Sequence, residues 1–222
     1  MAENTQEMVL ERIVTIQSNP LENRVIKIDN EAADECGAHT FDGWTEMQNK
    51  KNRFVISWAD IYQAVKEGDK KLIKSLRKDM EESWIVSNPL HDYKDNLLTD
   101  IIHYPGSKNP VICRNLVVPV WYRASLYDIL ETVEGLVYFQ ATNGTRDNAK
   151  AIKKAYYELS GCKADETFVD MPSQNSRKVY PKRASGFGYV SSEFLVDGSE
   201  DLDGSSRSRG VRISAAKKIH RK

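Results

Sequence analysis

Residues 57–80 read SWADIYQAVKEGDKKLIKSLRKDM, the clearest structural pattern in the chain. Ser57 can accept a hydrogen bond from the first helical turn and Asp60 can reach back to it, as in a capping box. Gly68 suits the left-handed residue that ends a helix, and Asp69 can cap a second helix. Apolar residues recur at helical spacing through both halves. The stretch therefore predicts a helical hairpin.

Beyond this hairpin, β-branched and aromatic runs alternate with further helical patterns, bounded by Asn-Pro, Pro-Gly or Asn-Gly pairs. Strands are predicted at 84–87, 100–104, 111–122, 136–140, 187–190 and 193–196. Helices are predicted at 125–133, where Gly135 ends the helix, and at 145–159, where Gly161 does. Upstream of the hairpin, the pattern predicts a helix at 4–17, a short strand at 25–28, and a loop or short helix across 29–51.

Together these elements predict an α+β fold with a mixed β-sheet, helices packed on it, an N-terminal helical hairpin and an irregular C-terminal tail. Composition divides the chain into an acidic N-terminal segment at 1–52, an α+β core at 53–172, and a Ser/Gly-rich and basic C-terminal region at 173–222.

The overall composition is that of a globular protein. Of 222 residues, 40% are hydrophobic and 29% charged, which excludes collagen-like and wholly disordered chains. No apolar run approaches the ~20 residues of a membrane span, and the first residues lack a signal-peptide pattern. The 3 cysteines fit reduced thiols. We therefore expect a cytoplasmic protein with no membrane partner, and no motif settles whether it is an enzyme.

The net charge of zero conceals a gradient along the chain. Residues 1–49 carry ten acids and three bases, whereas residues 207–222 carry seven bases and no acid. A basic end indicates a polyanionic partner such as nucleic acid. The two ends can also neutralise each other, within one chain or between subunits, so a structural or assembly protein and a homo-oligomer remain alternatives.

The C-terminal region also interleaves cations with aromatic rings between residues 177 and 194. Cations contact phosphates and ring faces stack on unpaired bases, as binding of single strands requires. Gly186-Phe-Gly-Tyr-Val190 resembles the middle of the RNP1 strand of RNA-recognition motifs over five residues. Ser185 and Ser192 depart from that motif on either side, so the similarity is local and no family is assigned.

The leading hypothesis is therefore a nucleic-acid-binding protein whose basic C-terminal region contacts phosphates and unpaired bases. The residues predicted to do so are Arg183, Phe187, Tyr189, Arg207, Arg209, Arg212, Lys217 and Lys218. A competing interpretation places Phe187 and Tyr189 in a strand that packs on the main sheet.

A second hypothesis is an enzyme or binding protein for a small phosphorylated or carboxylated ligand. The predicted strand at 136–140 leads through a polar turn into a helix, and Thr142, Thr145 and Arg146 would contact the anion there. The phosphate-loop lysine and spaced glycines are missing, so Thr145 is more simply interpreted as a helix cap.

Three further patterns carry weaker signals. Cys36-Gly-Ala-His39 has metal-ligand spacing but lacks a second pair, so no metal or cofactor is predicted. The acids and histidines between 91 and 103 could hold Mg²⁺, but solvated loop acids explain them better, since charged residues mostly face water. The second helix of the hairpin has a basic outer face, consistent with a helix-turn-helix reader of DNA or with a solvated surface. Its basic residues are Lys70, Lys71, Lys74, Arg77 and Lys78.

Overall fold

The structure is a computed structural model that describes residues 24–28, 40–50, 54–82, 84–104, 110–200, 202–203, 208 and 210–215. The helices are α2 (Phe41–Lys50), α3 (Trp58–Glu67), α4 (Lys70–Glu82), α5 (Leu126–Leu130), α6 (Val133–Asn143), α7 (Ala149–Ser160) and α8 (Gln174–Val179). The strands of the large sheet are β3 (Ile85–Lys94), β4 (Leu97–His103), β5 (Val111–Cys113), β6 (Val118–Pro119), β7 (Ala124–Ser125), β8 (Thr167–Asp170), β9 (Lys182–Val190) and β10 (Glu193–Glu200). A small sheet contains β1 (Arg24–Ile28), β2 (Phe54–Val55) and β11 (Gly210–Ala215).

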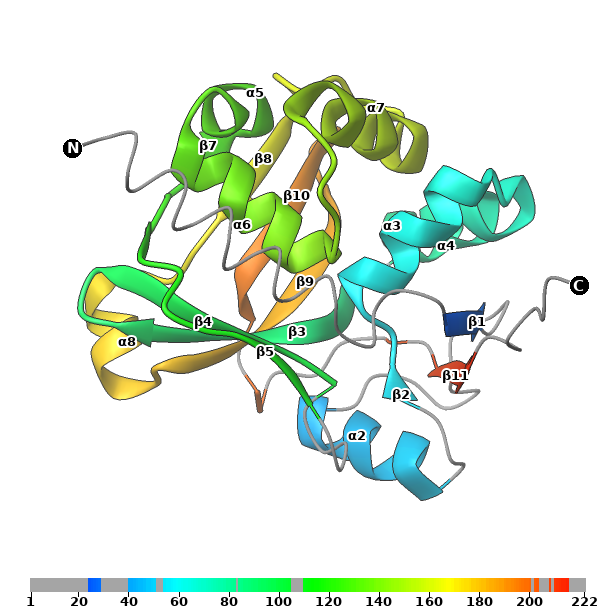
Figure 1. The fold of residues 1–222 in the computed structure, drawn as a ribbon, viewed down its shortest axis with the longest axis horizontal. Coiled ribbons are helices and arrows are strands. Elements are labelled where there is room, and N and C mark those ends of the chain that lie inside the picture. The colour runs from blue at the N-terminus through cyan, green and yellow to red at the C-terminus, as the bar shows by residue number, and fades with distance from the viewer. Residues whose placement is uncertain are drawn as a thin grey trace, which may run out of the picture.

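The large sheet has the strand order β5-β4-β3-β9-β10-β8-β7, with β6 paired to β4 (Figure 1). All of its pairings are antiparallel except β10 with β8, which is parallel. The predicted α+β class with a mixed sheet is therefore confirmed.

Helices α3 to α7 cover one face of this sheet and build the main core with it (Figure 1). Trp58, at the start of α3, is 1% exposed, and its ring meets Tyr156 of α7, Phe187 of β9 and Phe194 of β10. The other face carries a smaller cluster in which Phe41 and Trp44 of α2 pack against sheet residues. The sheet is thus covered on both faces, as its buried strands require.

The predicted helical hairpin is confirmed in detail. The Ser57 hydroxyl accepts from the Ala59 N–H at 3.2 Å, and the Asp60 carboxylate accepts from the Ser57 N–H at 3.0 Å. Gly68 adopts φ +76°, a left-handed conformation that glycine tolerates best. The Asp69 carboxylate then accepts from the Leu72 N–H at 2.9 Å and begins α4.

The predicted strand at 136–140 is wrong, because these residues belong to α6. Gly135, expected to end a helix, lies in the first turn of α6, where its N–H donates to the Thr132 hydroxyl at 3.0 Å. The preceding helix stops earlier, at Leu130. Nearly all of α6 from Val137 to Asn143 is buried, and a helix buried on all sides shows no amphipathic period that separates it from a strand.

The C-terminal strands are longer and more central than predicted. Residues 187–190 and 193–196 extend into β9 and β10, which lie in the middle of the sheet. Strands from both sides of the compositional boundary at 172/173 therefore pair in one sheet. Strand β3 continues past Asn88-Pro89, expected to bound it, because the register with β9 shifts between Ser87 and Leu90.

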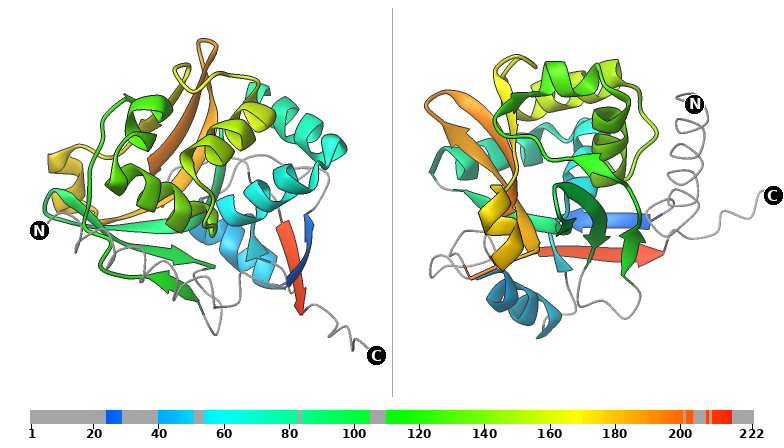
Figure 2. Two further views of the ribbon diagram at one scale, coloured as in Figure 1. Left: turned by 45° about the horizontal axis from the view of Figure 1, so that its top comes forward. Right: turned by 90° about the vertical axis from the view of Figure 1, so that its left-hand side faces the viewer.

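The two ends of the described chain pair with each other. β1, confirmed at the predicted position, runs antiparallel to β11, with Lys27 opposite Arg212 (Figure 2). Part of the tail predicted to be irregular is thus a strand. α2 is the short helix expected within 29–51. The helix predicted at 4–17 lies outside the described residues.

Candidate functional site

The aromatic rings predicted to stack on bases point into the protein. Phe187 is fully buried, with its ring centroid 4.6 Å from that of Trp58. Tyr189 is half-buried; its hydroxyl donates to the Ser160 carbonyl, and its ring meets Phe194 edge-on at 5.6 Å. The competing interpretation, in which these rings pack on the sheet, is confirmed. Phe187 consequently has no ring face at the surface for a base.

Of the cations predicted to contact phosphates, Arg183 is the one whose side chain lies in the described part of the chain. Arg183 is buried, donates to the carbonyl and hydroxyl oxygens of Ser176, and lies 5.3 Å from the ring centroid of Tyr180. Arg212 lies in β11, but its side chain is not described. The remaining residues of this prediction lie outside the described part of the chain, and their role stays a prediction: Arg207, Arg209, Lys217 and Lys218.

The turn proposed for a small anion joins two helices instead of a strand and a helix. Thr142 is fully buried in α6, Thr145 is half-buried, and Arg146 is exposed. The Thr145 hydroxyl accepts from the Asp147 N–H at 3.2 Å, so it does not cap α7. That cap is Asn148, three residues later than expected, whose side chain accepts from the first turn of α7.

Asp147 brings a negative charge into the same turn. Its carboxylate accepts from the Tyr62 hydroxyl at 2.8 Å and from the Lys66 ammonium at 2.7 Å. Burial by itself would raise the pKa of Asp147, but the hydrogen bonds from Lys66 and Tyr62 lower it below its usual value. The turn is therefore joined to α3 through the Asp147 carboxylate, which is paired with the Lys66 ammonium.

The histidines and acids between 91 and 103 do not converge on one site. His91 and His103 are buried, whereas Asp92 and Asp100 face each other across β3 and β4 nearer the surface. Across the described ranges, no three His, Cys, Asp or Glu side chains are grouped as metal ligands would be. Cys36 and His39 lie outside those ranges.

His91 makes the folded state sensitive to acid. The Ser185 hydroxyl donates to the Pro89 carbonyl at 2.8 Å, so it accepts from Nδ1 of His91 at 3.2 Å, while Nε2 faces the Tyr138 hydroxyl at 3.4 Å. A neutral ring satisfies these contacts. Burial, and secondarily the charge of His103, lower the pKa of His91 from 6.5 to about 3.

The unfolded chain therefore binds a proton at His91 between pH 6.5 and 3 that the folded chain does not bind. We expect the free energy of unfolding to fall by about 2 kcal/mol between pH 7 and 5 from this residue alone. Urea unfolding at both pH values measures this loss of unfolding free energy. In the His91→Gln variant the unfolding free energy should change less between pH 7 and 5, whatever the stability of the variant at pH 7. An equal pH dependence in both proteins would contradict the assignment.

A groove of about 790 Å³ lies between α4 and α7, near the end of α7. From the hairpin it is lined by Gly68, Lys70, Ile73, Lys74 and Arg77, and from α7 and its end by Tyr157, Glu158 and Gly161. The groove therefore combines a basic wall with an aromatic side chain.

Arg77 fixes the two walls relative to each other. Its Nε donates to the Leu159 carbonyl and its Nη2 to the Glu158 carbonyl, both at 2.8 Å. These carbonyls lie in the last turn of α7, where the helix dipole is negative and a cation is stabilising. Arg77 thus acts mainly as a structural bridge that holds α4 against α7.

The other cations of the groove lie at the surface. Lys70 and Lys74 are exposed, and Tyr157 is 53% exposed beside them. The groove's carboxylate belongs to Glu158, which lies 3.6 Å from the Lys154 ammonium, so its charge is largely balanced. Sequence reasoning found these lysines but missed Tyr157. The sequence feature that could have revealed Tyr157 is a large aromatic residue on the polar face of an amphipathic helix.

No helix in the described part of the chain combines the length and apolar character of a membrane span. Comparison with known proteins yields no matching family model, no matching curated protein and no matching solved structure.

Proposed function

We propose that the protein binds nucleic acid, and that the groove between α4 and α7 is the principal contact surface. The observation that carries this proposal is the shared lining of the groove by Lys70, Lys74 and the exposed ring of Tyr157. Ammonium groups attract phosphates, and an exposed aromatic ring offers a face on which an unpaired base stacks.

The groove favours a single strand over a duplex. Stacking on Tyr157 requires a base that is not already stacked on both sides, as in a single strand or a loop. The basic residues of 207–222 remain part of the proposal as additional phosphate contacts, which raise affinity without adding sequence preference. The groove and the basic residues of 207–222 therefore contribute separately to the affinity for nucleic acid.

The test is fluorescence anisotropy with labelled single-stranded RNA and DNA at low and moderate salt. Replacing Lys70 and Lys74 together by Gln should weaken binding about tenfold or more at low salt, and should reduce the slope of log affinity against log salt by about 1–2. Tyr157→Ala should weaken binding by about 1–3 kcal/mol with little change in that slope. Lys94→Gln, an exposed lysine outside the groove, is the matched control.

The outcomes separate the function from the site. Absence of binding at both salt concentrations overturns the proposed function. Salt-dependent binding that the groove variants leave unchanged keeps nucleic-acid binding but moves it away from the groove. An effect of Lys94→Gln equal to that of the groove variants reduces the interaction to general charge attraction.

A further inference from the structure

Helix α7 has a second flank, on the side of α5, beyond the groove that it forms with α4. In Figure 1, α7 lies between α5 and α4, and it contacts both helices. Lys150, Lys153 and Tyr157 follow one another at spacings of three and four residues, so they share one face of α7. The surface of α7 therefore continues from Tyr157, at the edge of the groove, to the contact with α5.

Tyr127 of α5 presents another exposed aromatic ring beside this face. It is 51% exposed, almost the same as Tyr157 at 53%. The Lys153 ammonium lies 4.0 Å from the centroid of the Tyr127 ring, as in a cation–π contact, and 2.8 Å from the Glu131 carboxylate. Lys153 thus holds the Tyr127 ring in position by covering one of its faces, and a base can stack on the other face.

Lys153 lies between the two exposed rings. It contacts the ring of Tyr127, and its Cβ is about 5–6 Å from that of Tyr157, one helical turn away. Lys150 is exposed on the same face and supplies a cation for a phosphate between two stacked bases. Aromatic rings interspersed with cations are the arrangement by which proteins hold single strands without reading their sequence.

We propose that the nucleic-acid strand leaves the groove across α7 and stacks a second base on Tyr127. The protein then binds an oligonucleotide at two stacking positions, one on Tyr157 and one on Tyr127, with Lys150 contacting a phosphate between them. This inference rests on the proposed function, because it extends the same binding surface. A mononucleotide is a poorer ligand, since it occupies only one of the two positions.

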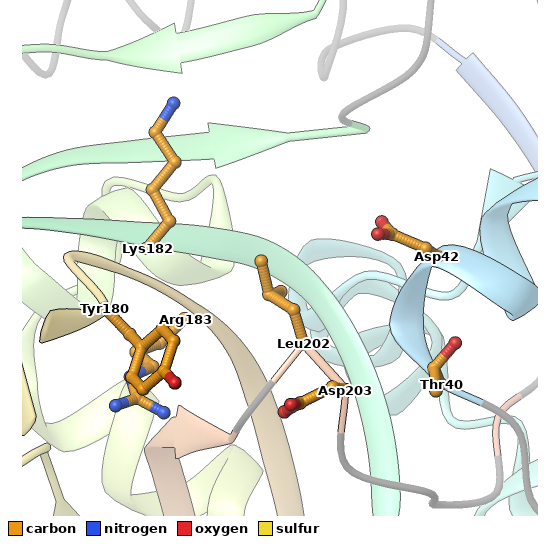
Figure 3. Close-up of a pocket in the computed structure, with 7 residues that line it drawn as sticks. All are labelled: Thr40, Asp42, Tyr180, Lys182, Arg183, Leu202 and Asp203. Carbon is orange, nitrogen blue, oxygen red and sulfur yellow. The ribbon is translucent and has the colours of Figure 1, made fainter.

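Tyr180 provides a matched control for the loss of an exposed tyrosine. It is 59% exposed, and its ring centroid lies 5.3 Å from the Arg183 guanidinium. Both residues line a different pocket, where the start of α2 faces the start of β9 (Figure 3). Removing the Tyr180 ring therefore shows whether any exposed tyrosine affects binding or only those beside α7.

The test is fluorescence anisotropy with a labelled uridine oligomer of about eight nucleotides, whose bases stack weakly on one another. Tyr127→Ala should weaken binding about tenfold, whereas Tyr127→Phe, which keeps the ring, should bind as the parent does. Because the two positions are independent, the losses from Tyr127→Ala and Tyr157→Ala should multiply to about a hundredfold in the double variant. Tyr180→Ala should leave the affinity unchanged.

The outcomes distinguish this inference from the proposed function. If Tyr157→Ala weakens binding and Tyr127→Ala does not, the inference is overturned and the proposed function stands. A double variant that binds no more weakly than the weaker single variant also overturns the inference, because both rings would then hold the same base. An equal loss in Tyr127→Phe and Tyr127→Ala, or in Tyr180→Ala and Tyr127→Ala, overturns stacking on Tyr127. Absence of binding by the parent overturns both proposals.

Discussion

Replacing Trp58 by Ala is expected to lower the free energy of unfolding by about 3–5 kcal/mol, a large part of the stability of a typical domain. The Trp58 ring stacks on Tyr156 with centroids 5.5 Å apart and lies 4.6 Å from Phe187. It therefore connects the helical layer to the centre of the sheet. Removing it leaves a cavity that α3, fixed by its capping box, cannot readily collapse to fill.

Urea unfolding followed by circular dichroism measures the loss, and Tyr157→Ala provides the surface control. Tyr157 is half-exposed on the adjoining helix, so its removal should change stability by no more than about 0.5 kcal/mol. Trp58→Phe, which retains a ring, should cost less than Trp58→Ala. A Trp58→Ala protein as stable as Tyr157→Ala would contradict the packing described here.

Gly135→Ala is expected to destabilise the fold by about 2 kcal/mol or more, although alanine is the better helix former by about 1 kcal/mol. A Cβ at this position would lie 2.0 Å from the Ile129 carbonyl oxygen and 2.4 Å from its Cγ2. That oxygen accepts from the N–H and the hydroxyl of Thr132, so it has little freedom to move away. The close approach of α5 to α6 therefore requires glycine.

Gly68→Ala is the matched comparison, because a Cβ there meets no atom within 4 Å. Its cost arises only from the left-handed backbone at φ +76° and should be about 1–2 kcal/mol. Thermal unfolding of both variants shows which substitution lowers the stability more. A Gly135→Ala protein more stable than the parent would show that helix propensity outweighs the contact with Ile129.

The elements that sequence reasoning located well are those specified locally. The hairpin of α3 and α4 is encoded by a cap, a left-handed glycine and one apolar face, all within 24 residues. The elements it missed depend on distant partners. Residues 136–139 show no alternation of apolar and polar side chains, and only the sheet and helices around α6 make them a helix instead of a strand.

In the candidate site, too, the locally encoded part was predictable from the sequence and the part that depends on distant residues was not. The basic face of α4 was visible in the sequence because Lys70 and Lys74 recur on the side opposite Leu72 and Leu76. The groove itself was not visible, since its second wall comes from α7 and is joined through Arg77, about eighty residues away along the chain. The alternation of Phe187 and Tyr189 is typical both of a strand that binds a ligand and of a strand that packs in the core. The burial of Phe187 shows that its ring belongs to the core.

The position of β9 between β3 and β10 has a consequence for how the chain acquires its structure. Ser87 of β3 donates to the carbonyl of Ser185, a residue 98 positions later. During synthesis, one side of β3 stays open until that later strand has left the ribosome. A nascent chain of this length presents an unpaired edge to other chains, so we expect slow folding and a demand for chaperones at that stage.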